Sequence, residues 1–192
     1  MPQGNQSDWR RHGGPLMSQR DSGYERKERD SYETPAWVTE IIVKYITGNR
    51  CVWEPAAGNG KMAEVLRRHG MEVSATDITT GDDFLSAQAL RNSYITAIVT
   101  NPPYALAQEF IEHALRLTEP ACGVVAMLLR TDFDHARTRR HLFGDCRQFW
   151  AKVVLTKRIK WFQHSKGQPS FNHAWFLWSW AHDRVPMLAY EP

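Results

Sequence analysis

Short apolar runs alternate with amphipathic stretches along residues 34–130, and this alternation limits the choice of fold more than any other feature of the chain. The runs are rich in β-branched residues, as buried strands are, and the stretches between them repeat apolar residues at helical spacing. Strands separated by helices form parallel sheets, so the pattern predicts a doubly wound α/β fold. We expect strands at 50–55, 71–78, 95–104 and 122–130, and helices at 34–45, 60–70 and 107–118. Thr34 is expected to cap the first helix, with Pro35 at its first helical position.

The last part of the chain is expected to complete this sheet in another way. Residues 151–162 and 173–180 alternate or run apolar, as strands do, and the gap between them is too short for a helix of useful length. We therefore predict that they form an antiparallel hairpin at one edge of a mostly parallel sheet. Residues 135–145, before the hairpin, are expected to be helical.

The two ends of the chain differ in composition. Residues 1–30 are polar, rich in Gly, Arg and Ser, and nearly free of aliphatic side chains. Such a segment buries too little apolar surface to offset the entropy lost on ordering. We predict a disordered polar tail over 1–30 and one folded domain over 31–192.

Composition also excludes several classes of protein. No apolar run approaches the roughly 20 residues of a membrane span, and the N-terminus lacks the apolar core of a signal peptide. The three cysteines are widely spaced, which indicates neither a zinc knuckle nor a disulfide framework and suits a reducing cytoplasm. The run "DFDH" (132–135) is expected to open a helix rather than bind a metal, and the histidines are expected to be ordinary polar or packed residues.

An apolar run that ends in "NPPY" (101–104) carries the first functional signal. Two prolines cannot continue a strand, because each lacks a backbone donor and has a fixed φ. Asn101 and Tyr104 therefore follow the carboxyl end of a strand, where open α/β sheets bind their ligands.

A glycine-rich turn, "EPAAGNG" (54–60), follows the strand at 50–55 and precedes a helix. Small residues there let a ligand approach the backbone, although a tight strand-to-helix connection explains them about as well. The spacing fits neither a P-loop nor the dinucleotide fingerprint. Asp77 ends the next strand, where an acid can bind the ribose hydroxyls of a nucleoside-bearing ligand.

These motifs, taken in order, resemble the class I S-adenosylmethionine-dependent methyltransferases, and among them the DNA adenine-N6 enzymes with the gamma motif order. "YETP" (32–35) resembles their methionine-binding motif, 54–60 their glycine loop, and "GDDFL" (81–85) the segment that contacts the cofactor adenine. The resemblance covers roughly residues 31–130 and implies a Rossmann-like sheet of the class I methyltransferase type. The S-adenosylmethionine-binding residues that it implies are Tyr32, Thr34, Pro35, Glu54, Pro55, Ala56, Gly58, Gly60, Asp77, Ile78, Asp83, Phe84 and Asn101.

The resemblance makes "NPPY" the catalytic motif, with Asn101, Pro102, Pro103 and Tyr104 as its residues. An exocyclic amine is a poor nucleophile, because its lone pair is delocalised into the ring. Acceptors on the Asn101 side chain and the Pro102 carbonyl would hold its two N–H groups and stabilise developing charge. Tyr104 would stack on a base that has left its helix. Cytosine C5 chemistry is disfavoured, because no cysteine follows the prolines. The plain alternative is that "NPPY" is only a strand-ending turn.

The C-terminal half is basic and aromatic. The stretch from Arg130 to Lys166 contains ten Lys and Arg residues but only three acids. This excess is larger than the net charge of the whole chain, +3, so the rest of the chain is net acidic. This stretch is either a solvated face or a phosphate-binding surface. We expect Arg158 and Lys160 to contact phosphates and Phe171 to stack on the base, although its aromatic neighbours also suit core or edge packing.

We therefore expect a DNA adenine-N6 methyltransferase. The alternatives are amine methylation of RNA bases, methylation of a protein glutamine, and a non-catalytic nucleic-acid-binding module on the same fold. The segment after Thr131 is used to finish the sheet, so no separate target-recognition domain is expected. That fits a small solitary enzyme of a phage or mobile element. A homodimer and a separate specificity partner both stay open.

Overall fold

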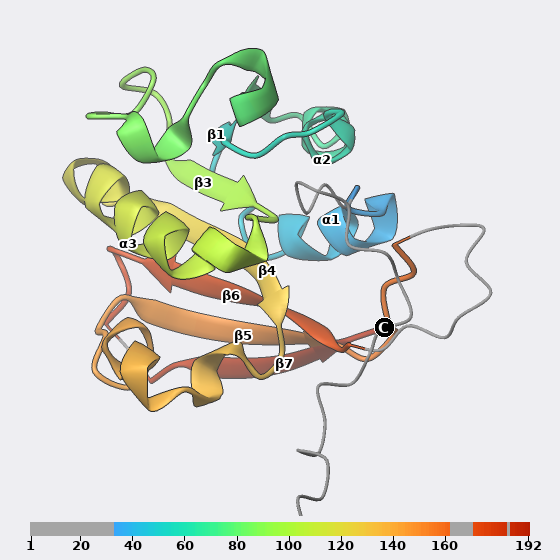
Figure 1. Cartoon of the computed structure of the whole chain (residues 1–192), viewed down its shortest axis with the longest axis vertical. Helices are drawn as coiled ribbons and strands as arrows, with labels where there is room; N and C mark the ends of the chain where they lie inside the picture. The colour runs from blue at the N-terminus through green and yellow to red at the C-terminus, as the bar shows by residue number, and fades with distance from the viewer. Residues whose placement is uncertain (1–32, 162–170, 184) are drawn as a thin grey trace, which may run out of the picture.

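The computed structural model describes residues 33–161, 171–183 and 185–192, and a seven-stranded sheet forms their centre. The strand order is β2-β1-β3-β4-β6-β5-β7, and the strands from β1 to β7 in this order are labelled from top to bottom in Figure 1. The strands span Cys51–Glu54 (β1), Glu72–Ala75 (β2), Ala97–Thr100 (β3), Val124–Arg130 (β4), Phe149–Leu155 (β5), His173–Ser179 (β6) and Met187–Glu191 (β7).

The sheet is mostly parallel. β2, β1, β3 and β4 pair in parallel, and β5 pairs in parallel with β7. β6 is antiparallel to both of its neighbours, β4 and β5. The predicted α/β class and the antiparallel C-terminal hairpin of β5 and β6 are therefore confirmed.

Helices cover both faces of the sheet, as the doubly wound prediction requires. α1 (Ala36–Val43) and α2 (Lys61–Arg68) pack with one buried cluster, and α3 (Ala107–Thr118) packs with the other. Alternate strand residues divide between the two clusters: Val52 faces α1 and α2, whereas Trp53 faces α3. Figure 1 shows α3 lying across β3 and β4.

Three local expectations need correction. α1 is capped by Pro35 in an extended conformation, so Thr34 stands one residue before the cap instead of forming it. Residues 135–145 form no α-helix, because the chain folds there into short 3-10 turns at Phe133–His135 and Arg137–Leu142. The hairpin is not the edge of the sheet, because β7 continues the sheet beyond β5.

The C-terminal strand is also tied to the first helix. The Glu191 carboxylate accepts hydrogen bonds from Lys44 Nζ at 2.7 Å and from Tyr45 Oη at 2.9 Å. Burial, followed by the bond to Glu191, raises the pKa of Tyr45 to about 12. The end of the chain is thereby fastened to the segment that leads into β1.

Candidate active site

The turn after β1 leaves open space above its backbone. Gly58 has φ +51° and Gly60 has φ +79°, a left-handed conformation that glycine adopts without strain. A Cβ atom at either position would meet nothing within 4 Å. Hydrogen bonds fix the turn: Ala57 N donates to Thr76 O at 2.9 Å, and Gly60 N donates to Ala57 O at 2.8 Å. This segment, residues 54–60, is called the glycine loop below.

Asp77 joins the glycine loop to the end of β2. One carboxylate oxygen accepts from Gly58 N at 2.8 Å, and the other accepts from Thr79 N at 2.9 Å and Thr79 Oγ1 at 2.7 Å. Burial opposes ionisation of this group, but the bonds from Thr79 and Gly58 outweigh it and lower the pKa of Asp77. The next residue, Ile78, is 67% exposed, so an ionised acid and an apolar side chain stand side by side.

Glu54 is the last residue of β1 and the first of the glycine loop, and it is almost fully buried. Burial raises its pKa to about 8, against the opposing effects of an Ala63 backbone hydrogen bond and the Arg67 charge. Its Oε2 atom has no hydrogen-bond partner among the residues that the structure describes. Pro55 beside it is buried, and Ala56 packs against the α3-side cluster.

The segment before α1 reaches the glycine loop through Glu33. Its carboxylate accepts from Asn59 Nδ2 at 2.5 Å and forms an ion pair with Lys61. Thr34 is buried, and Pro35 caps α1. Tyr32, predicted to bind the cofactor, lies outside the described residues. Glu33 was not predicted as a site residue from the sequence. The only signal in the sequence was that Glu33 lies within the motif at 32–35.

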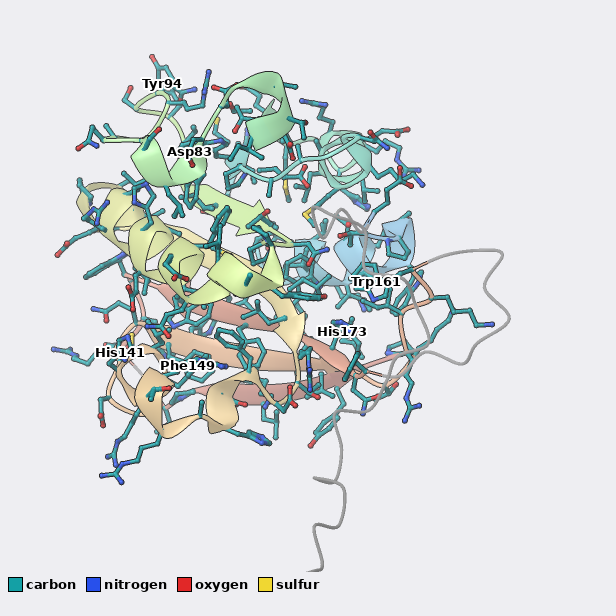
Figure 2. The ribbon with its side chains drawn as sticks, in the orientation of Figure 1. Asp83, Tyr94, His141, Phe149, Trp161 and His173 are labelled. Atoms are coloured by element: carbon teal, nitrogen blue, oxygen red, sulfur yellow. The ribbon has the colours of Figure 1, made fainter. Side chains whose placement is uncertain are left out.

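Asp83 and Phe84 have different surroundings. Asp83 is exposed and caps a 3-10 turn by accepting from Leu85 N at 3.0 Å. The Phe84 ring is buried against Trp53, with ring centroids 5.2 Å apart, and against Phe110 at 4.8 Å. The Phe84 ring therefore belongs to the core. A ligand could contact the main chain of Phe84 but not its ring. Asp83 lies at the upper left of Figure 2, away from Trp161 and His173.

The "NPPY" turn begins where β3 ends, at Thr100. Asn101 is half-buried, and Pro102 is buried. Pro103 then starts the 3-10 turn Tyr104–Leu106. Because β3 is the parallel neighbour of β1, this turn and the glycine loop leave the same edge of the sheet.

An aromatic row extends from Tyr104 toward the strands that follow β4. The Tyr104 ring stacks on His173, with centroids 6.2 Å apart and planes inclined by 27°. Trp161 meets His173 edge-on at 5.2 Å. Both labelled residues, Trp161 and His173, lie at the right-hand end of the sheet in Figure 2. We call Tyr104, His173 and Trp161 the aromatic row. The sequence predicted Tyr104 as a site residue but not its contact with His173, because residues so far apart in the chain meet only through the fold.

Phe171 has a cationic neighbour. The Arg130 guanidinium lies 4.1 Å from the centre of its ring, and Arg130 is itself held by two hydrogen bonds to Asp132. One face of the Phe171 ring is therefore covered. A base that stacks on Phe171, as predicted, would have to use the other face or displace Arg130.

The basic stretch divides into paired and exposed cations. Its three acids each hold one cation, in the pairs Arg130–Asp132, Lys152–Asp134 and Arg140–Asp145. At the end of β5, by contrast, the exposed cations are Lys157, Arg158 and Lys160. Arg158 Nε donates to Asn172 Oδ1 at 2.8 Å, and Lys157 lies over the Trp37 ring. The sequence could not separate these two groups, because the pairing depends on the fold.

Within the described residues, no group of three or more His, Cys, Asp and Glu side chains is arranged to hold a metal ion. No helix in that part of the chain is long and apolar enough to cross a membrane.

Comparison with known proteins gives a clear answer at the level of the fold. No protein-family model matches the chain, and no curated protein matches it in sequence. Solved structures do match. A candidate RNA methyltransferase from Pyrococcus horikoshii is 15% identical, with a TM-score of 0.59, over 79% of this chain and 87% of the other. The fold is that of a class I methyltransferase.

Two further structures of this fold agree. A candidate class I S-adenosylmethionine-dependent methyltransferase from Listeria monocytogenes is 15% identical, with a TM-score of 0.55, over 80% of this chain and 62% of the other. The modification subunit of a candidate type I restriction enzyme from Vibrio vulnificus is 14% identical, with a TM-score of 0.57, over 79% of this chain. The match spans 45% of that subunit.

Proposed function

We propose that this chain is an S-adenosylmethionine-dependent methyltransferase that methylates the exocyclic N6 amine of adenine in DNA. One observation carries the proposal: on a class I methyltransferase fold, the "NPPY" turn after β3 stands at the same sheet edge as the open glycine loop after β1. A catalytic motif and a cofactor loop need this adjacency if a methyl group is to pass between them.

The residues at the glycine loop fit the cofactor. Gly58 and Gly60 leave room for close approach, the Asp77 carboxylate suits ribose hydroxyls, and exposed Ile78 offers an apolar surface to a nucleobase. Asp83, Thr34, Pro35 and the main chain of Phe84 complete the proposed set, together with Glu54, Pro55 and Ala56. When bound, S-adenosylmethionine supplies an electrophilic methyl group on a positively charged sulfur.

Asn101 is the proposed acceptor for the target amine. Its amide oxygen and the Pro102 carbonyl take the two N–H groups, which orients the nitrogen lone pair and stabilises the charge that develops on the nitrogen. Pro103 restricts the turn, and the Tyr104 ring provides a stacking surface for the base. Arg158 and Lys160 contact phosphates beside it.

The choice of DNA draws support from the neighbouring fold in a restriction-modification subunit, which also makes a separate specificity chain a candidate partner. Amine methylation in RNA is the second candidate, because another structural neighbour carries the name of an RNA methyltransferase. Both substrates present the planar amine that "NPPY" would bind.

A transfer assay tests the proposal. The full chain is incubated with methyl-labelled S-adenosylmethionine and, in parallel, with duplex DNA, single-stranded DNA, RNA and a protein extract, and the products are digested and identified by mass. We expect N6-methyladenine in DNA. Asn101→Ala should abolish transfer, because it removes an acceptor of the reacting amine, and should weaken cofactor binding far less than it weakens transfer.

Asn92→Ala, on the exposed connection before β3, serves as the matched control and should keep activity. Label in RNA or protein alone would overturn the DNA assignment. Absence of label from every substrate would overturn the proposed activity.

A further inference from the structure

His173 is the least expected residue of the aromatic row. It begins β6 directly opposite Arg130 of β4, and only 2% of its surface is exposed. Its Nδ1 atom is buried and has no hydrogen-bond partner among the described residues. A buried polar ring of this kind is costly for a protein, so its place in contact with Tyr104 calls for an explanation.

His173 connects the "NPPY" turn with the exposed cations at the end of β5. Its ring stacks on Tyr104, and it also makes a T-shaped contact with Trp161. Its neighbour Asn172 accepts from Arg158, and the Asn172 carbonyl accepts from Thr131 N at 3.0 Å. The start of β6 therefore joins an exposed cation at the end of β5 to the tyrosine of the "NPPY" turn.

Burial and the Arg130 charge lower the pKa of His173 to about 4. The ring therefore stays neutral under ordinary conditions and presents a flat, uncharged face to Tyr104. Offset aromatic pairs at this separation are favourable and hold both rings in a preferred orientation. Leucine would fill a similar volume but would offer no flat face.

We propose that His173 is a positioning residue that fixes the orientation of the Tyr104 ring, the ring that would stack on the target base. This inference rests on the proposed function for its effect on catalysis. The expected effect of His173 on the orientation of Tyr104 does not depend on the proposed function.

The experiment measures both effects in the full chain. His173→Leu removes the flat ring, and His173→Phe retains it. His182→Leu is the matched control, since His182 contacts Trp150 with centroids 6.3 Å apart, beyond the other end of β6. Each protein carries 3-fluorotyrosine, and the Tyr104 fluorine signal, one of six, is assigned with Tyr104→Phe. KM, kcat and S-adenosylmethionine affinity are measured alongside.

We expect His173→Leu to shift the Tyr104 signal and to raise KM for the nucleic acid by about three- to tenfold, the range for loss of one aromatic pair. Cofactor affinity should stay unchanged, and His173→Phe should resemble the wild type in both readouts. A Tyr104 signal unaltered in His173→Leu would overturn the inference, whatever the activity. If His173→Leu shifts the Tyr104 signal but the wild type transfers no methyl group, the positioning of Tyr104 is supported and the proposed function is overturned.

Discussion

At the scale of single residues, burial decides the state of the groups around the site. Glu54 and His173 are both buried and both favour the neutral form, whereas Asp77 is held ionised by hydrogen bonds. The sequence identified Glu54 and Asp77 by their place after strands. It could not reveal that Phe84 is a core ring or that Arg130 covers Phe171, because these contacts depend on how distant segments pack.

Glu54 predicts a pH dependence of stability. The pKa of Glu54 rises from 4.5 to about 8 on folding. The contribution of this group to the free energy of unfolding is therefore highest below pH 4.5, where Glu54 is protonated in both states, and it falls as the pH rises through 8. Glu54→Gln stays neutral throughout. We expect its advantage in unfolding free energy over the wild type to grow between pH 5 and pH 8, by on the order of a few kcal/mol. Urea titrations at both pH values measure it.

Glu64→Gln, an exposed change on α2, is the control and should show no such growth. Parallel stability curves for the wild type and Glu54→Gln would contradict the assigned burial of this carboxyl.

At the scale of elements, the sequence predicted the four parallel strands and the helices α1, α2 and α3, because each combines clear periodicity with a Gly or Pro boundary. It missed β7, since Met187–Glu191 is short and partly exposed and gains its strand form from pairing with β5. The 3-10 turns around Arg137–Leu142 also escaped it. We expected a helix over 135–145, whereas the packing of Leu142 and Phe143 into the core sets the actual path.

The fastening of β7 to α1 predicts a measurable stability. Tyr45→Phe removes the bond to Glu191, and we expect it to lower the unfolding free energy by about 1 kcal/mol, the usual value for one hydrogen bond. Chemical denaturation checks this. Tyr94→Phe is the matched control, because Tyr94 is 75% exposed, and it should have no effect. Equal unfolding free energies for Tyr45→Phe and Tyr94→Phe would show that the Tyr45–Glu191 hydrogen bond does not stabilise the protein.

At the scale of the whole molecule, one sheet edge carries the glycine loop, the "NPPY" turn and the start of the aromatic row. The exposed cations Lys157, Arg158 and Lys160 follow the end of β5. Three other cations of the basic stretch are paired with its acids, and Arg137 and Arg147 are also exposed. A nucleic acid bound at the end of β5 would release counterions when its phosphates are neutralised.

Removing two of these cations should change the salt dependence of binding. For Arg158→Gln/Lys160→Gln we expect the slope of log K against log salt to fall by about 1 to 2, since each lost phosphate contact contributes about 0.9 on duplex DNA. Fluorescence anisotropy with a labelled duplex measures the slope. The control, Arg50→Gln/Arg68→Gln, removes the same charge from exposed positions elsewhere and should leave it unchanged. An equal fall in both variants would indicate a general charge effect.

The central claim is that the glycine loop and Asp77 hold S-adenosylmethionine, and calorimetric titration of the full chain with this cofactor tests it most directly. We expect the wild type to bind one equivalent and Asp77→Ala to bind at least about tenfold more weakly, a difference of about 1.4 kcal/mol. Asp145→Ala, which removes an exposed carboxylate paired with Arg140, should bind like the wild type. No heat of binding in the wild type, or equal affinity in Asp77→Ala, would contradict the account.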